Sequence, residues 1–152
     1  MKTPNVLKVW QISQHLPLGQ HVFTGLLCIK IPFFTTIYPL VERLEPDYCK
    51  VKMKKTRFLI NHVSSIHAIA LCNLAEFTGG LMAQVTIPKQ YRWIPKGMSV
   101  EYLHKAKTNL YAVAIPVDNQ IIGQGDYDVK IDVYDQHDVL VFRAIMHLWI
   151  SN

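Results

Sequence analysis

Three polar residues stand out in a mostly small and apolar stretch near the middle of the chain, NHVSSIHAIALCNLAEFTGG, residues 61–80. They are an amide, Asn61, an imidazole, His67, and a carboxylate, Glu76. The stretch contains no Lys or Arg that would pair with Glu76. Because a buried, unpaired carboxylate is costly, Glu76 must face solvent, pair with a distant arginine or serve a function. A carboxylate beside a stabilised oxyanion is suited to acid–base catalysis.

A helix through this stretch would supply the oxyanion site at its N-terminus. The N–H groups of His67, Ala68 and Ile69 fall in the first turn, where backbone donors lack intrahelical partners and can polarise a carbonyl. Glu76 lies about 13 Å further along the helix axis than His67 and on nearly the opposite side. One chain therefore cannot bring both groups to one reacting atom, whereas two copies of the helix packed antiparallel about a two-fold axis would.

The elements that must position these residues indicate an α+β fold. Apolar residues at helical spacing, alternating segments, and Pro and Gly at the boundaries define them. The central helix is expected to start at Ser64 or Ser65, both good N-caps. In chain order we predict helices over 6–16 and 22–30, strands over 39–45 and 48–54, a helix over 65–83, and strands over 98–106, 110–117, 121–134 and 139–150. This order favours an antiparallel sheet with one helix in its core.

Composition narrows the class of protein. The 152 residues fit one domain, and 50% of them are hydrophobic. A chain this short cannot easily bury so much apolar surface alone, so we expect a subunit interface. Three cysteines without metal-ligand spacing indicate reduced thiols in a cytoplasmic protein. The N-terminal segment lacks a signal-peptide pattern, and the most apolar run, 22–40, contains lysine and proline, so we expect no membrane association.

Charged residues give further limits. The net charge is +5, and the basic residues concentrate in 50–57, in 89–96 and at two lysines after 104. No recognised nucleic-acid motif accompanies them, so a solvated surface or a small polyanion is favoured over nucleic acid. Asp126, Asp128 and Asp132 share one face of a predicted strand, but nothing nearby completes a ligand set, so no metal site is expected.

The spacing of Asn61, His67 and Glu76 resembles the signature of hotdog-fold acyl-CoA thioesterases of the phenylacetyl-CoA type. That signature reads Asn, five residues, His-Gly-Gly, and then an Asp or Glu on the same helix. The segments PFFTTIYP, 32–39, and YLHKA, 102–106, are closer still to an uncharacterised branch of the hotdog superfamily whose members are described as thioesterases.

The resemblance covers about residues 35–150 and implies the architecture. A curved antiparallel sheet would wrap around the central helix in a single hotdog domain, with residues 1–35 as a helical extension and 36–152 as the core. It also implies a homodimer, with a dimer of dimers as a further possibility, and sites shared between chains.

The resemblance implies a role for each residue of the motif. Glu76 would be the general base or nucleophile, and the N–H of Ala68 would polarise the thioester carbonyl. Asn61 would hold the attacking water or the substrate oxygen, and His67 would shape the helix N-terminus. Where the family has two glycines this chain has Ala68 and Ile69, so the backbone N–H survives while Ile69 narrows the slot for substrate.

The same resemblance implies how substrate is bound. His104, Lys105 and Lys107 lie at a strand end, where hotdog enzymes meet the nucleotide end of coenzyme A. Asn73, one turn before Glu76, is a candidate hydrogen-bond partner for it. The substrate would be a thioester of coenzyme A or of acyl carrier protein, and coenzyme A would enter as part of the substrate, with no other cofactor.

Other interpretations stay open at this point. Glu76 can be a solvated helix acid, His67 a structural residue, and Asn61 a turn residue. The basic residues near 104–107 can be plain surface. A non-catalytic protein that binds an acyl or aromatic ligand is the alternative function, because Ala68 and Ile69 replace the glycines, and a hotdog dehydratase is a weaker third.

Overall fold

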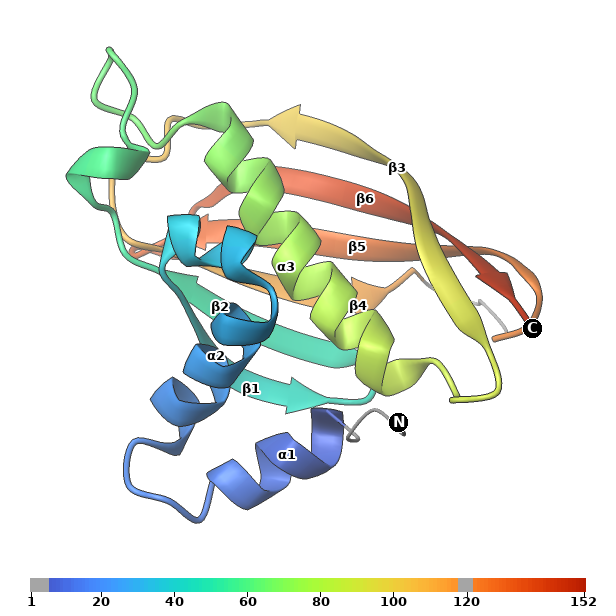
Figure 1. Ribbon diagram of the computed structural model, residues 1–152. Coiled ribbons are helices and arrows are strands. Elements are labelled where there is room, and N and C mark those ends of the chain that lie inside the picture. The colour runs from blue at the N-terminus through green and yellow to red at the C-terminus, as the bar shows by residue number, and fades with distance from the viewer. Residues whose placement is uncertain (1–5, 118–121) are drawn as a thin grey trace.

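The computed structural model describes residues 6–117 and 122–152 (Figure 1). Within them the chain forms α1 (Val6–Ser13), α2 (Gly19–Lys30), the 3-10 helix η1 (Pro32–Ile37), β1 (Pro39–Glu45), β2 (Tyr48–Met53), the 3-10 helix η2 (Arg57–Leu59), α3 (Ala68–Thr86), β3 (Arg92–Tyr102), β4 (Leu110–Pro116), β5 (Gly125–Asp135) and β6 (Leu140–Ser151). The predicted α+β class and the hotdog arrangement are confirmed.

The six strands form one antiparallel sheet in the order β1-β2-β4-β5-β6-β3. The sheet curves around α3, which crosses its concave face, while α1 and α2 lie beside β1 (Figure 1). Because α3 connects β2 to β3, it carries the chain from one side of the sheet to the far edge. Within the described strands β3 pairs only with β6, which leaves its other edge open.

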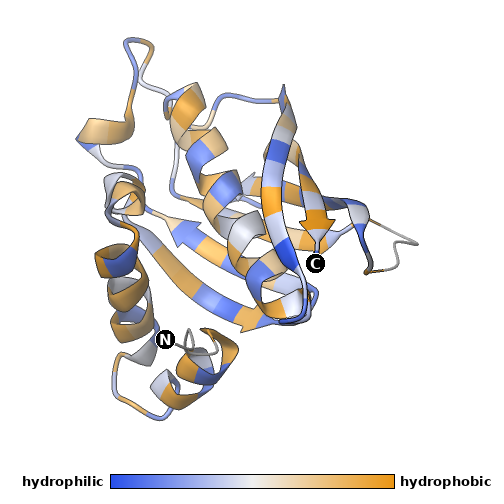
Figure 2. Ribbon diagram, turned by 45° about the vertical axis from the view of Figure 1, so that its right-hand side comes forward, coloured by the Kyte–Doolittle hydropathy of each residue, from blue (hydrophilic) through white to orange (hydrophobic). Residues whose placement is uncertain are grey.

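Alternation along the strands explains which face carries the core. In β5 the side chains of Tyr127, Val129, Ile131 and Val133 are buried against α3 and its neighbours, while the intervening residues point to the convex outer face. The same alternation appears as bands of contrasting hydropathy along the strands in Figure 2. The outer face is therefore polar, and the chemistry-bearing residues divide between the two faces.

The start of α3 differs from the prediction. Neither serine is its N-cap: Ser64 has a positive φ of 59°, and Ser65 donates its hydroxyl to the carbonyl of Ala106. The N-cap is His67, and the helix begins at Ala68. Tertiary hydrogen bonds of the preceding loop thus override the local preference of serine for the cap.

The boundaries of two strands were also predicted wrongly. β3 was predicted over 98–106, but it begins at Arg92, ends at Tyr102 and runs through Pro95 and Gly97. A bulge between these two residues absorbs the irregularity, and an edge strand tolerates a proline because its free side needs no ladder hydrogen bond. β5 begins at Gly125, whose φ of 121° favours glycine, rather than at residue 121. The sequence also indicates a turn at Asp118 and Asn119, and these two positions lie outside the described residues.

The N-terminal helices are tied to the sheet. Trp10 of α1 packs edge-on against Phe23 of α2, with ring centroids 5.0 Å apart. In α2, Thr24 accepts a hydrogen bond of 3.0 Å from the N–H of Val41 in β1. The division of the chain at residue 35 into extension and core stays a prediction.

α3 is long and apolar enough to cross a membrane, but 56% of its apolar window is buried inside the fold. That is the usual state of a core helix in a soluble α+β domain.

Adjacent glycines in α3 provide a test of core packing. A Cβ at Gly79 would lie 2.9 Å from Met146 Cε and 3.0 Å from Ile131 Cδ1, whereas at Gly80 its nearest neighbour would be Trp93 at 3.5 Å. Both Gly→Ala changes gain about 1 kcal/mol of helix propensity, but only Gly79→Ala overpacks the core, at about 1–3 kcal/mol. We expect Gly80→Ala to be more stable than Gly79→Ala by about that difference in urea unfolding. Equal stability of the two variants would show that Met146 and Ile131 move aside freely.

Candidate active site

The N-terminus of α3 presents one unengaged backbone donor. The N–H of His67 donates to the carbonyl of Leu59 at 2.7 Å, and the N–H of Ile69 donates to Nδ1 of His67 at 3.2 Å. Of the three donors predicted from the sequence, only the N–H of Ala68 has no hydrogen bond to any described residue. The expectation of a three-donor site is therefore corrected to one donor. Nδ1 of His67 is therefore the acceptor of the N-cap hydrogen bond, a role that in a neutral imidazole leaves the N–H on Nε2.

Asn61 organises the loop that leads into this helix. Its Oδ1 accepts hydrogen bonds from the N–H groups of Val63 and Ser65, both at 3.1 Å. Its own N–H donates to the carbonyl of Ser65 at 2.8 Å. The side-chain oxygen is thus used in an Asx-type turn, and the amide NH₂ remains to face a ligand.

A cavity of about 330 Å³ opens in front of this N-terminus. Four residues predicted to be in the site, Asn61, Ala68, His104 and Lys105, line it together. The loop before α3 and the chain segment after β3 meet there because Ile66 N–H donates to the carbonyl of Ala106 at 2.8 Å. The structure therefore brings an amide, a backbone donor, an imidazole and an ammonium group to one opening.

Tyr102 belongs to the same cavity and was given no role from the sequence. Its hydroxyl lies 3.2 Å from Cys72 Sγ and 3.5 Å from the carbonyl oxygen of Ala68. The contact with Cys72, helped by partial burial, raises the pKa of Tyr102 to about 12. Tyr102 is therefore a neutral hydroxyl at physiological pH and can act as a donor beside the helix N-terminus. Its contacts depend on the end of β3 lying beside the first turns of α3, which no sequence pattern specifies.

Glu76 lies apart from that cavity. It lines a second, largely apolar cavity of about 320 Å³, whose other lining residues include Lys30, Phe34, Phe77, Gly80 and Trp93. The carboxylate is exposed in the single chain and forms no hydrogen bond or ion pair with any described residue. In one chain the carboxylate of Glu76 is therefore not buried, and the free-energy cost of burying an unpaired charge does not arise. Along α3, Glu76 is about 12 Å from Ala68.

Four predicted residues lie outside both cavities: His67, whose contacts are given above, and Asn73, Lys107 and Ile69. Asn73 is buried and donates to Thr36 Oγ1 at 3.2 Å, so the predicted contact with Glu76 is wrong: Asn73 faces η1. Lys107 is exposed, and its carbonyl accepts from Lys55 Nζ at 2.8 Å. Ile69 is 64% exposed, one turn before Cys72 on the side of α3 that also carries Glu76. Among the described residues there is no cluster of His, Cys, Asp or Glu that would hold a metal ion.

Comparisons with known proteins agree with the fold. The structural-genomics protein APC5556 is 37% identical, with a TM-score of 0.83 over 96% of this chain and 97% of that one. A protein of unknown function from Pseudomonas aeruginosa, described as a probable thioesterase, is 24% identical, with a TM-score of 0.76 over 90% and 98% of the two chains. A Streptococcus mutans protein bound to acetyl CoA is 18% identical, with a TM-score of 0.65 over 74% and 87%.

The sequence matches none of the curated proteins. One protein family matches residues 19–150, which is most of the chain and includes every candidate site residue. The chain therefore belongs to the family described as domain of unknown function DUF4442, and it has the hotdog fold.

Proposed function

We propose that the protein hydrolyses acyl thioesters of coenzyme A. The observation that carries the proposal is the unengaged N–H of Ala68 at the mouth of the cavity that also contains Asn61, Tyr102 and two basic side chains. A helix N-terminus that retains one free donor favours the oxyanion of a tetrahedral intermediate. The thioesterase descriptions of several structural neighbours, together with the acetyl CoA bound to one of them, support this class of reaction.

A homodimer would complete the site. Ile69, Cys72 and Glu76 lie along one side of α3 that is not covered by the sheet, and β3 offers an open edge. Two copies related by a two-fold axis along this side would place the partner's Glu76 over the N-terminus of α3. In that arrangement Ala68 of one chain meets Glu76 of the other, although the two residues lie about 12 Å apart within each chain. The contact also covers part of the exposed apolar surface.

The reaction then follows from the groups present. The partner's Glu76 takes a proton from water while the water oxygen bonds to the thioester carbon. The carbonyl oxygen becomes an oxyanion that accepts from the N–H of Ala68. The C–S bond breaks, the proton held by Glu76 passes to the leaving thiolate, and a carboxylic acid and a thiol are released. The NH₂ of Asn61 donates to the attacking water or the acyl oxygen.

The two cavities divide the substrate between them. The apolar cavity beside Glu76 is at the small end of the range for ligand pockets, so we assign it to a short or aromatic acyl group. His104 and Lys105 border the cavity at the helix N-terminus and are placed to meet the phosphates of coenzyme A. A carrier-protein thioester presents a phosphopantetheine arm of the same chemistry.

Ligand binding without turnover is the second candidate function, and one observation favours it. Ile69 occupies the position of a family glycine and projects from the first turn of α3 with 64% of its surface exposed. A side chain there restricts how closely a thioester approaches the N–H of Ala68.

The test is thiol release from a panel of acyl-CoAs, with short, long and aromatic acyl groups, alongside binding measured by calorimetry. We expect turnover, with kcat/KM highest for small acyl groups. In Gly80→Leu the new side chain enters the apolar cavity beside Trp93, and kcat/KM should fall about tenfold or more for the larger groups while acetyl-CoA is little affected.

Gly25→Leu is the matched control, because it makes the same change in the exposed part of another helix, where a Cβ meets nothing within 4 Å. It should retain the wild-type profile. Binding of acyl-CoA without thiol release from any member of the panel would replace the hydrolase by the binding protein.

A further inference from the structure

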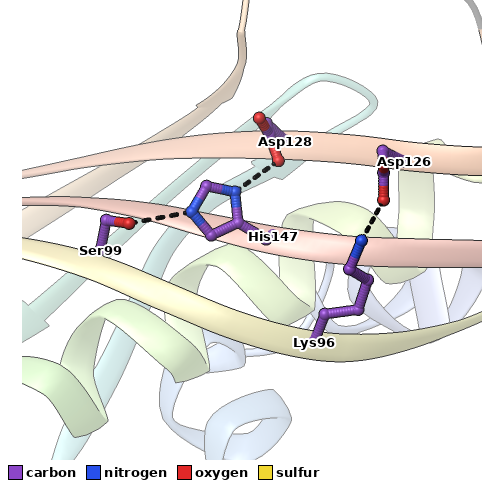
Figure 3. Close-up of polar contacts among 5 residues, drawn as sticks. All are labelled: Lys96, Ser99, Asp126, Asp128 and His147. Carbon is purple, nitrogen blue, oxygen red and sulfur yellow. Dashed lines mark hydrogen bonds and ion pairs between the residues drawn. The ribbon is translucent and has the colours of Figure 1, made fainter.

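Three side chains on the outer face of the sheet form a continuous hydrogen-bonded row. Ser99 of β3, His147 of β6 and Asp128 of β5 lie on three neighbouring strands (Figure 3). Ser99 Oγ is 3.0 Å from His147 Nε2, and His147 Nδ1 is 2.8 Å from Asp128 Oδ1. This face is opposite to the one that packs on α3, so the row is separate from both cavities of the candidate active site.

The strand register builds this row. Asp128 is the cross-strand partner of His147 on one side, and Gly97 is its partner on the other. Gly97 has no side chain to meet the imidazole, and the ring instead reaches Ser99, the next outward-facing residue of β3. Residues distant in sequence are thereby held by three strands of one rigid sheet.

The donors and acceptors of this row determine which nitrogen of His147 carries the proton. An ionised carboxylate only accepts, so the hydrogen bond to Asp128 places the proton of a neutral His147 on Nδ1. Nε2 then carries a lone pair and accepts the hydroxyl proton of Ser99. This is the tautomer and the order of groups with which a serine–histidine–aspartate triad deprotonates its serine.

Neighbouring pairs on this face lack that feature. Lys96 pairs with Asp126 (Figure 3), and Arg143 pairs with Asp132 through two hydrogen bonds of 2.6 and 2.9 Å. Each of these is a closed ion pair in which a permanent cation meets a carboxylate. Among the described residues of this face, only the His147 pair has a second nitrogen that accepts from a hydroxyl, and Ser99 is exposed to solvent.

We propose that Ser99 is an activated nucleophile that takes acyl groups from small, activated esters. Ser99 Oγ bonds to the ester carbonyl carbon while its proton moves to His147 Nε2, and the imidazolium is stabilised by Asp128. The bond from the carbonyl carbon to the leaving oxygen then breaks, and the proton passes from Nε2 to the leaving group. In the second step the oxygen of water bonds to the carbonyl carbon of the acyl-serine while its proton moves to His147 Nε2. The bond from that carbon to Ser99 Oγ then breaks, and the proton passes from Nε2 to Oγ, which regenerates Ser99 and releases the acid.

The substrate class follows from the surroundings of Ser99. Neither cavity of the candidate active site includes Ser99, and the hollow of about 440 Å³ over β4 on this outer face does not include it either, so no cavity beside Ser99 would bury a long acyl chain. Among the described residues, no row of backbone donors like that of a helix N-terminus faces Ser99 Oγ. A donor with a good leaving group needs least oxyanion stabilisation, so activated esters of small acids fit best.

The probe is p-nitrophenyl acetate, with acetylation of the Ser99 peptide followed by mass spectrometry. Ser64 is the internal reference, since it is exposed and its hydroxyl contacts no histidine in the described structure. We expect Ser99 to be acetylated about tenfold or more faster than Ser64, and His147→Gln to remove that difference. In His147→Ala, added imidazole should restore part of the acetylation, a rescue that a purely structural histidine would not show.

Asp128 acts through His147 as a positioning residue. In Asp128→Asn the new side-chain amide can donate to Nδ1 of His147, which favours the tautomer with the proton on Nε2. Because Nε2 is then a donor and cannot take the proton of Ser99, acetylation of Ser99 should fall about tenfold or more. Asp132→Asn is the matched control, because it removes the same charge from the same face of β5, and it should leave acetylation unchanged. Acetylation of Ser99 at the rate of Ser64, or an equal loss in both Asn variants, would overturn the proposal. Thiol release from acyl-CoA is measured in a separate assay, so failure of the Ser99 proposal is distinguishable from failure of the proposed thioester hydrolysis with Glu76.

Discussion

Glu76→Gln is expected to lower kcat for thioester hydrolysis by about 10²- to 10⁴-fold, with a much smaller change in KM. Glutamine keeps the shape and the hydrogen-bonding reach of the side chain but cannot take a proton from water. Because the carboxylate is exposed and forms no ion pair or hydrogen bond with the described part of the chain, its replacement breaks no polar contact there. The thermal midpoint and the oligomeric state should therefore stay at their wild-type values, as scanning calorimetry and sedimentation would show.

Glu101→Gln is the matched control for this variant. Glu101 is an exposed residue of β3 that lines neither cavity, and the substitution makes the same change in net charge. It should retain wild-type kcat, which would exclude a general effect of charge on the binding of anionic substrates. Equal kcat in Glu76→Gln and the wild type would remove Glu76 from the mechanism and leave water activation to another group.

Local patterns were enough to predict the class of fold and the identity of the central helix. Alternation and helical spacing act within one segment, so β1, β2 and the core of α3 follow from the residues themselves. The family resemblance added the wrapping of a curved sheet around that helix, whereas the order of the strands in the sheet was not predicted. Boundaries failed where tertiary contacts decide them. His67 replaces a serine as N-cap because the loop before α3 is held to Leu59 and Ala106.

Contacts between distant segments account for what the sequence did not predict. The face of Asp128 on its strand was predicted, but its partner His147 depends on register, and a slip of one residue would move either side chain to the other face. Tyr102 reaches Ala68 and Cys72 only because the end of β3 lies beside the first turns of α3. Such pairs are properties of the assembled sheet, and one sequence does not encode them in any local pattern.

Ala68→Pro is expected to lower kcat by about 10²- to 10³-fold, since it deletes the one unengaged backbone donor. Ala68 is the first residue of α3, a position that proline favours because its N–H has no intrahelical role. His67 has φ −61° and ψ 137°, a conformation that is compatible with a following proline. Ala68→Ser keeps the N–H at nearly the same size and should retain activity. Circular dichroism would verify that α3 persists in both variants.

Mixing the two inactive proteins separates a shared site from a site within one chain. In a heterodimer of Ala68→Pro and Glu76→Gln, one site receives the intact N–H from one chain and the intact carboxylate from the other, while the second site lacks both. Each heterodimer would carry one working site, so random exchange at equal concentrations should recover about a quarter of wild-type activity. Recovery requires that the two groups act across the interface, because a chain that needed both of its own would stay inactive in every mixture. Absence of recovery after complete subunit exchange, verified by native mass spectrometry, would rule out the two-chain arrangement and require Glu76 and Ala68 to act on different atoms.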